Sequence, residues 1–204
     1  ALGRVFVASD NRVLYSIDAR SGCAYWAYHA ESTGRFAPAV GPIAGYPATR
    51  YAVYFVTAPG TAHAVDAQTG TLLWKTEIPG LHAVNASATL ADGRLFIPFA
   101  GTETFAGSQP MYECCRSRGG VAALDANTGR ILWNVDSIPE PVRRLGEQPN
   151  GVAIWGPSGA SVWNAPTVDR KRRRVYVGTG NSYGPVAAVT SDSILALDID
   201  TGKA

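Results

Sequence analysis

The sequence has little of what would mark a membrane, haem-binding or nucleic-acid-binding protein. Among 204 residues there are three cysteines, three histidines and one methionine, and the formal net charge is only +2. A charge this small favours no class of charged partner. No apolar run is long enough to span a bilayer, and no signal peptide is recognisable. No Cys-x-x-Cys-His motif occurs, so we expect any haem partner to be another domain or protein.

What the sequence does contain is an internal repeat with the pattern small-x-Asp-x-x-Thr/Ser-Gly-x-x-x-Trp. Complete copies span residues 16–26, 64–74 and 123–133, and a fourth copy begins at Ala196. The Asp side chain can accept hydrogen bonds from backbone N–H groups two or three residues on, and the Gly can supply a positive φ, so the pattern predicts a tight turn. We expect the Trp to pack between successive repeat units.

Two further series of segments complete the unit. Apolar runs at 5–7, 53–56, 95–97 and 175–177 read as strands, and stretches of small residues at 37–40, 87–90 and 165–168 precede three of them. Small residues suit the crowded centre of a radial array. With almost no helix signals, the sequence predicts an all-β partial β-propeller with about four four-stranded blades, roughly residues 1–30, 35–78, 84–136 and 161–204, in one domain.

The two ends of the sequence fall inside this pattern. The chain begins at Ala1 within a strand, without a Met, and stops two residues before the fourth Trp would stand. An unclosed propeller exposes two sheet edges. We therefore expect the chain to be a fragment of a longer propeller of seven or eight blades.

The third unit carries an insertion between Pro98 and Val121 that contains two adjacent cysteines, Cys114 and Cys115. Loops longer than a dozen residues in a compact domain are usually functional or disordered. The pair either forms a disulfide or stays as two free thiols, and the loop setting favours the disulfide. Cys23, after the glycine of the first turn, is expected to be a small buried residue.

The remaining polar features have structural explanations. His29, His63 and His82 are interpreted as structural residues. The basic run at 169–174 would suit nucleic acid, but its position between an inner strand and the next strand favours a solvated hairpin turn. The Pro- and Glu-containing segment 136–149 is expected to be a surface connection.

Three stretches together resemble the pyrroloquinoline quinone (PQQ) dehydrogenases, and within them the polyvinyl-alcohol-dehydrogenase-like branch. They are residues 112–119 with the Cys pair, 155–169 with a Gly-Pro-Ser-Gly-Ala-Ser-Val-Trp run, and 175–181 with 190–194. The resemblance covers essentially the whole chain. It implies a quinoprotein that oxidises an alcohol or polyol by hydride transfer to calcium-bound PQQ and passes electrons to a c-type cytochrome. It also implies a periplasmic or secreted protein, which the cysteine pair suits.

The resemblance also implies roles for individual residues. Trp163 would form the floor under the quinone ring, and Ser161 would bond the rim of the cofactor. Glu113 and Asn181 would ligate calcium, and Arg118 would approach the acidic cofactor. Calcium prefers carboxylate and amide oxygens, which agrees with this pair of metal ligands.

Further cofactor contacts come from the cysteines and from the repeat. In the best-known relatives the paired cysteines cover the quinone from an earlier blade, so a covering role for Cys114 and Cys115 would be a departure. Counting back from the inner strands, Arg35, Asn85 and Trp163 occupy one slot in three successive blades. A cation, an amide and an aromatic ring at one mouth of the central channel of the propeller would suit PQQ, which is a flat tricarboxylate.

Two functions from different classes remain open. In the enzyme, the catalytic base is expected beyond Ala204, with Asp192 as a weak candidate within the chain, so the chain alone should not turn over alcohol. The alternative is a non-catalytic repeat scaffold for protein–protein interaction, like the outer-membrane assembly lipoproteins. Glu113, Trp163 and Asn181 discriminate between them, because a scaffold has no reason to gather these side chains at one mouth.

Overall fold

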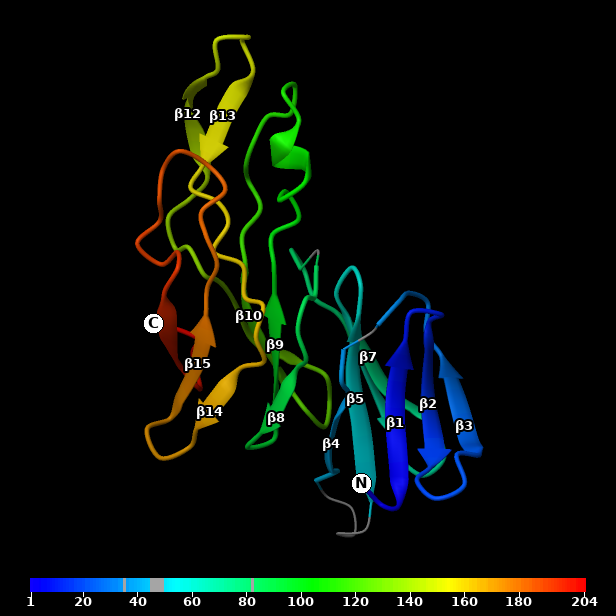
Figure 1. The fold of residues 1–204 in the computed structure, drawn as a ribbon. Helices are drawn as coiled ribbons and strands as arrows, with labels where there is room; N and C mark the ends of the chain where they lie inside the picture. The colour runs from blue at the N-terminus through cyan, green and yellow to red at the C-terminus, as the bar shows by residue number, and fades with distance from the viewer. Residues whose placement is uncertain (35, 45–49, 82) are drawn as a thin grey trace.

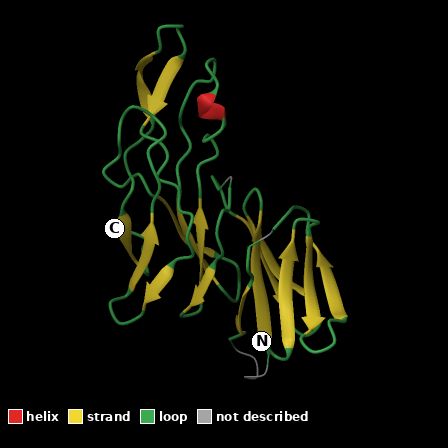
Figure 2. Ribbon diagram, viewed as in Figure 1, coloured by secondary structure: helices red, strands yellow, loops and turns green. Residues whose placement is uncertain are grey.

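The protein is a series of antiparallel sheets that follow one another in an arc (Figure 1). The computed structural model describes residues 1–34, 36–44, 50–81 and 83–204. Strands dominate these ranges, and the helical element among them is a single 3-10 turn, η1 (Ala106–Ser108), which Figure 2 shows in red. No helix in the described part of the chain has the length and apolar character needed to cross a membrane.

Four of the sheets are up-and-down meanders. The first contains β1 (Arg4–Ser9), β2 (Val13–Asp18) and β3 (Ala24–His29), and the second β4 (Ala39–Pro42), β5 (Tyr51–Thr57), β6 (Thr61–Asp66) and β7 (Leu72–Glu77). The third contains β8 (Thr89–Ala91), β9 (Arg94–Phe99), β10 (Gly120–Asp125) and β11 (Ile131–Asp136), and the fourth β14 (Thr167–Asp169), β15 (Arg174–Gly178) and β16 (Ile194–Asp198). The all-β, propeller-type architecture is confirmed. The first and fourth sheets, however, have three strands instead of the expected four.

The small-residue segments form the inner strands, as predicted. β4, β8 and β14 pair with β5, β9 and β15, and β8 lies between β4 and β14. Neighbouring blades meet closely here, because the Thr89 hydroxyl donates to the Pro166 carbonyl at 2.7 Å. Small side chains allow the inner strands to converge in this way.

The Asp and Gly of each repeat build the predicted turn. In the third copy, Oδ1 of Asp125 accepts from the backbone N–H groups of Asn127 (3.0 Å) and Thr128 (2.9 Å). The Gly129 N–H donates to the Asp125 carbonyl at 2.8 Å, and Gly129 has a φ of +73°. The same Asp hydrogen bonds recur in the other three copies.

The Trp of each complete repeat packs against the Asp turn of the next blade and hydrogen-bonds to it. Trp74 Nε1 donates to the Ala126 carbonyl at 2.9 Å, and a Cβ placed on Gly129 would lie 2.6 Å from the Trp74 ring. Trp26 and Trp133 make the same contacts with the turns of the second and fourth blades, donating to the carbonyls of Ala67 and Ile199. The expected packing of Trp between blades is confirmed, and it explains why the Asp turn and the Trp occur together in the pattern.

Apolar cores fill the spaces between neighbouring sheets. β5 and β9, which contain the apolar runs 53–56 and 95–97, are buried on both faces. In β1, by contrast, partly buried and exposed residues alternate, and Val5 and Val7 are exposed. The reason is that no sheet in the described ranges covers the outer face of the first blade. His63 is fully buried beneath Tyr28 and Phe55, which supports its structural role.

Two expectations about local structure were wrong. Cys23 is exposed, because the turn after the first repeat glycine points its side chain to solvent. The segment 136–149 is not a plain connection, since β12 (Arg143–Glu147) pairs with β13 (Ala153–Gly156) in a separate hairpin. The basic run does form the turn between β14 and β15, where Arg170 pairs with Asp92. His82 lies outside the described residues.

Candidate functional site

The insertion and the β12–β13 hairpin extend beyond the strands at one end of the arc (Figure 1). Below them, loop segments from three of the resembling motifs lie side by side. The Gly119 N–H donates to the Gly159 carbonyl, the Ala160 N–H to the Asn181 carbonyl and the Gly180 N–H to the Ser161 carbonyl, each at 2.9 Å. The structure therefore brings the backbones next to Arg118, Ser161 and Asn181 into one layer.

Trp163 lies against the segment of this layer that carries Asn181. The Trp163 side chain is 55% exposed, although tryptophan is usually mostly buried. A Cβ placed on Gly180 would lie 4.0 Å from Cζ2 of Trp163, so the indole borders the segment that carries Asn181. The Asn181 side chain is exposed, and its Nδ2 donates to the Ser182 carbonyl at 2.9 Å. An exposed indole thus borders the backbone segment that carries the exposed Asn181 side chain.

Ser161 and Arg118 are engaged by protein groups. Ser161 is buried, and its hydroxyl accepts from the Gly101 N–H at 3.0 Å and is hydrogen-bonded to the Tyr183 hydroxyl at 2.7 Å. Arg118 donates to the Ile138 carbonyl at 2.8 Å and pairs with Asp136 at 3.2 Å. Both residues are therefore structural contributors, and their contacts with a cofactor stay predictions.

Cys114 and Cys115 form a disulfide, the favoured one of the two alternatives. Cys115 is fully buried, and the pair packs against Gly107 of the insertion. The Cys115 N–H donates to the Trp155 carbonyl at 3.2 Å, and the Trp155 N–H donates to the Cys114 carbonyl at 2.7 Å. These two backbone hydrogen bonds join the cysteine pair of the insertion to the β12–β13 hairpin, and whether the disulfide covers a cofactor stays a prediction.

Glu113, the predicted calcium ligand, faces the hairpin. Its carboxylate pairs with Arg116 at 2.7 Å and accepts from Trp155 Nε1 at 3.2 Å. The hydrogen bond from Arg116 comes first among the causes that lower the pKa of Glu113, followed by that from Trp155. The contacts of Glu113 are thus with Arg116 and Trp155, and its role as a calcium ligand beside Asn181 stays a prediction.

Glu103 is a carboxylate that the sequence reasoning missed. It is only 6% exposed, and it accepts from the Tyr112 hydroxyl (3.0 Å), the Arg116 N–H (2.6 Å) and the Ser117 N–H. Burial raises the pKa of Glu103, but the hydrogen bonds from Ser117 and then Arg116 outweigh burial and hold it below its usual value. Glu103 is therefore a buried, ionised carboxylate in the same group of loops.

The order of the strands could have pointed to Glu103. It follows β9 by four residues, much as Asn181 follows β15 by three, so the two side chains leave equivalent strands of successive blades at the same end. Glu113 was predicted from the family resemblance, by its place before Arg118, Gly119 and Asp125 in the sequence. Its sequence position says nothing about the direction of its side chain.

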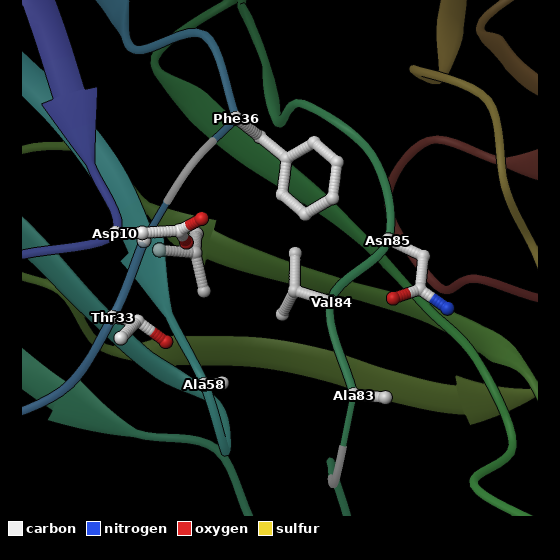
Figure 3. A pocket seen from close by; sticks show the side chains of 9 residues that line it. Asp10, Thr33, Phe36, Ala58, Ala83, Val84 and Asn85 are labelled. Carbon is white, nitrogen blue, oxygen red and sulfur yellow. The ribbon is translucent and has the colours of Figure 1, made fainter.

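Asn85 lies at a different place, on a cavity of about 280 Å³ between the loops that precede β4 and β8. Figure 3 shows the Phe36 ring above Val84, with Asp10 and Thr33 on one side and Asn85 on the other. Trp163 does not line this cavity. Arg35 lies outside the described residues, so the proposed ring of three slot residues stays a prediction.

Asp192, the weak candidate for a base, is exposed beside the site. Its N–H donates to the Gly180 carbonyl at 3.0 Å, which places its backbone next to the Asn181 segment. In the ranges that the structure describes, no three His, Cys, Asp or Glu side chains cluster as a metal site would require.

Comparison with known proteins agrees with this architecture. A family model described as outer membrane protein assembly factor BamB matches residues 1–182. The polyvinylalcohol dehydrogenase of Sphingopyxis sp. (strain 113P3) is 40% identical over 202 residues, which cover 98% of this chain and 31% of the relative. A polyvinylalcohol dehydrogenase of Pseudomonas sp. is 42% identical over 210 residues, again 98% of this chain and 32% of the relative.

The solved structures agree on the fold. The crystal structure of quinohemoprotein alcohol dehydrogenase from Comamonas testosteroni superposes with a TM-score of 0.67 at 24% identity, covering 98% of this chain and 32% of that one. The chain thus spans about a third of the length of the curated relatives it matches. The repeated Asp turns, the interblade tryptophans and these matches show that the chain belongs to the PQQ-type β-propeller family.

Proposed function

We propose that this chain supplies part of the PQQ- and calcium-binding site of a quinoprotein that oxidises an alcohol or polyol. The observation that carries the proposal is the exposed Trp163 indole, which borders the segment that carries Asn181. A flat, anionic quinone needs an open aromatic face, and most tryptophans of this fold are instead committed to interblade packing. The dehydrogenase names of the relatives support the same reading.

The residues of the candidate site offer some of the ligands that PQQ and calcium need. The Asn181 carboxamide is an exposed oxygen donor, and Glu103 is an ionised carboxylate from the equivalent strand of the preceding blade. Calcium takes oxygen ligands of these two kinds. We favour Glu103 over Glu113 as the carboxylate ligand, because Glu103 follows β9 as Asn181 follows β15, at the same end of equivalent strands. Glu103 would have to exchange the Tyr112 hydroxyl for the ion.

When bound, PQQ supplies a quinone carbonyl that accepts a hydride, and calcium polarises that carbonyl. This chain would contribute the platform under the ring through Trp163 and oxygen ligands through Asn181 and Glu103. The substrate class that the relatives' names suggest is a vinyl-alcohol polymer or another secondary alcohol. A c-type cytochrome is the proposed electron acceptor, and the proposed location is periplasmic or secreted.

Reconstitution tests the proposal directly. The complete protein is titrated with PQQ at saturating calcium, and binding is followed by quenching of tryptophan fluorescence and by reduction of an artificial dye with polyvinyl alcohol or 2-propanol. Trp163→Ala should weaken PQQ binding about tenfold or more, because the stacked ring loses its platform, whereas Trp163→Phe should retain most of it. Trp155→Phe, which alters an indole on the hairpin, is the matched control. Failure of the wild-type protein to bind PQQ at all would refute the proposal.

Measurements of calcium affinity can show whether Glu103 or Glu113 is the ligand. Glu103→Gln should weaken calcium binding to the PQQ-loaded protein by about tenfold or more, while Glu113→Gln should change it little. The opposite ranking would restore Glu113 as the ligand. Circular dichroism at 20 °C intervals up to unfolding would show whether either variant has lost its fold.

A scaffold for protein assembly is the second candidate, favoured by the description of the family model that matches residues 1–182. A scaffold needs neither PQQ nor calcium. A correctly folded wild-type protein that binds neither, at concentrations where a quinoprotein is saturated, would favour this candidate over the enzyme.

A further inference from the structure

Tyr183, which no sequence motif singled out, connects the loops of the candidate site. Its hydroxyl is hydrogen-bonded to the Ser161 hydroxyl at 2.7 Å and accepts from the Thr104 hydroxyl at 3.1 Å. It also donates to the Gly101 carbonyl at 3.4 Å. One phenol oxygen therefore joins the segment after β9 to the segment before β14.

The backbone and the ring of Tyr183 also make contacts with distant segments. The Tyr183 N–H donates to the Ser158 carbonyl at 3.1 Å, and the Tyr183 carbonyl lies 4.0 Å from the Cys114 sulfur. A Cβ on Gly101 would lie 2.8 Å from Cε2 of Tyr183, so the ring packs directly on a backbone that only glycine leaves open. The contacts of Tyr183 thus reach three segments that are distant in sequence: residues 101–104, Cys114 and residues 158–161.

We propose that Tyr183 is a positioning residue that holds Asn181 and Glu103 at a fixed separation. This inference rests on the proposed function. Asn181 precedes Tyr183 by two residues, and the hydroxyl of Tyr183 bonds Gly101 and Thr104 on either side of Glu103. The two proposed ligands sit on separate loops, and no hydrogen bond among the described residues joins them directly. The phenol is the shared contact that sets their spacing.

A fixed spacing matters because ions are bound tightly only where their ligands are held in place beforehand. Removal of residues that orient metal ligands typically weakens metal binding. The phenol is well suited to the role, since its rigid ring spans from the Asn181 loop to the Thr104 loop without a flexible stem. A purely packing role would need the ring but not the hydroxyl.

The test is therefore Tyr183→Phe, which keeps the ring and removes only the hydroxyl. In the complete protein loaded with PQQ, calcium affinity should fall about three- to tenfold, the range expected for the loss of one or two neutral hydrogen bonds. KM for the alcohol should change less than the calcium affinity. The matched control is Tyr176→Phe on β15, whose hydroxyl bonds none of these loop residues within the described chain. Equal calcium affinities for the two variants would overturn the inference.

Hydrogen exchange gives a readout that needs no cofactor. Without PQQ or calcium, Tyr183→Phe should speed amide exchange at residues 101–104 and 181–183 by about fivefold, and should leave the β5–β6 pair unchanged. Thr104→Val should act in the same direction, and the double variant should show less than the sum of the two effects. Unchanged exchange at these loops would refute the positioning role. Should the wild-type protein bind no PQQ, the proposed function fails, while the exchange data still decide whether Tyr183 holds the loops.

Discussion

The contact between Trp74 and the turn of the next blade predicts that a side chain at Gly129 would destabilise the protein. The φ of Gly129 is +73°, and a Cβ there would lie 2.6 Å from Cε3 and 2.7 Å from Cδ2 of Trp74. Carbon atoms normally approach no closer than about 3.5 Å, so the indole would have to move by roughly 1 Å. That movement would also strain the hydrogen bond from Trp74 Nε1 to the Ala126 carbonyl. Gly129→Ala should therefore loosen the junction between the second and third blades.

The magnitude has two parts that a matched control separates. An alanine in the left-handed region costs about 1–2 kcal/mol, and overpacking a tight contact costs about 1–3 kcal/mol more. Gly93 has a φ of +69° in the same sheet, but a Cβ there meets nothing within 4 Å. Gly93→Ala should thus cost only the backbone part, about 1–2 kcal/mol. We expect Gly129→Ala to lose about 1–3 kcal/mol more than Gly93→Ala.

Thermal and urea unfolding of the two variants measure this difference. For a domain of this size, 1 kcal/mol corresponds to about 2–4 °C in Tm, so the variants should differ by several degrees. The tryptophan emission of Gly129→Ala should also change, since the ring is displaced, while that of Gly93→Ala should not. Equal losses of stability in the two variants would show that the Trp does not press on the turn, and the account of the repeat would fail.

Three further predictions concern the core and the turns. Burial lowers the pKa of His63 to about 4, so the folded protein holds it neutral while the unfolded chain binds a proton below about pH 6.5. Stability should be fully present above that pH and fall by up to about 3 kcal/mol as the pH drops toward 4, and a His63→Leu variant should lose this slope in urea titrations at a series of pH values. Trp133→Phe removes the 3.1 Å hydrogen bond to the buried Ile199 carbonyl and should cost about 1–3 kcal/mol, and no change in Tm would contradict the interblade role. Asp125→Ala removes an acceptor of three hydrogen bonds and should cost about 1–3 kcal/mol at pH 7. Burial raises the pKa of Asp125, but the hydrogen bonds from Thr128 outweigh it and lower the pKa. The stability difference from wild type should therefore be fully present above the ordinary aspartate pKa and shrink as the pH falls from there through the lowered pKa, and a pH-independent difference would argue against the turn.

The repeat could be found without coordinates because its determinants are local. The Asp, the Gly and the hydrogen bonds between them span five residues, and the Trp follows at a constant spacing, so periodicity alone identifies the turn and the strand. The inner strands were equally predictable, because small residues recur at the same place in each unit. Even the interblade position of Trp74 followed from its recurrence, although the acceptor on Ala126 did not.

The site depended on contacts that no local pattern contains. Glu113 and Glu103 are both glutamates of one insertion, yet Glu113 faces Arg116 and Trp155 while Glu103 is buried among backbone N–H groups. The proposed positioning role of Tyr183 depends on Gly101 and Ser161, which are far away in the sequence and hydrogen-bond to its hydroxyl.

The sequence by itself determined the repeated blade, its turns and the family to which the chain belongs. Only the tertiary structure decided which carboxylate of the insertion is buried, that Cys23 is exposed, and that residues 143–156 form a hairpin. The physical reason is the range of the interactions. A blade is built from hydrogen bonds between neighbours in sequence, whereas the direction of a loop side chain is set by whichever distant segment packs against it.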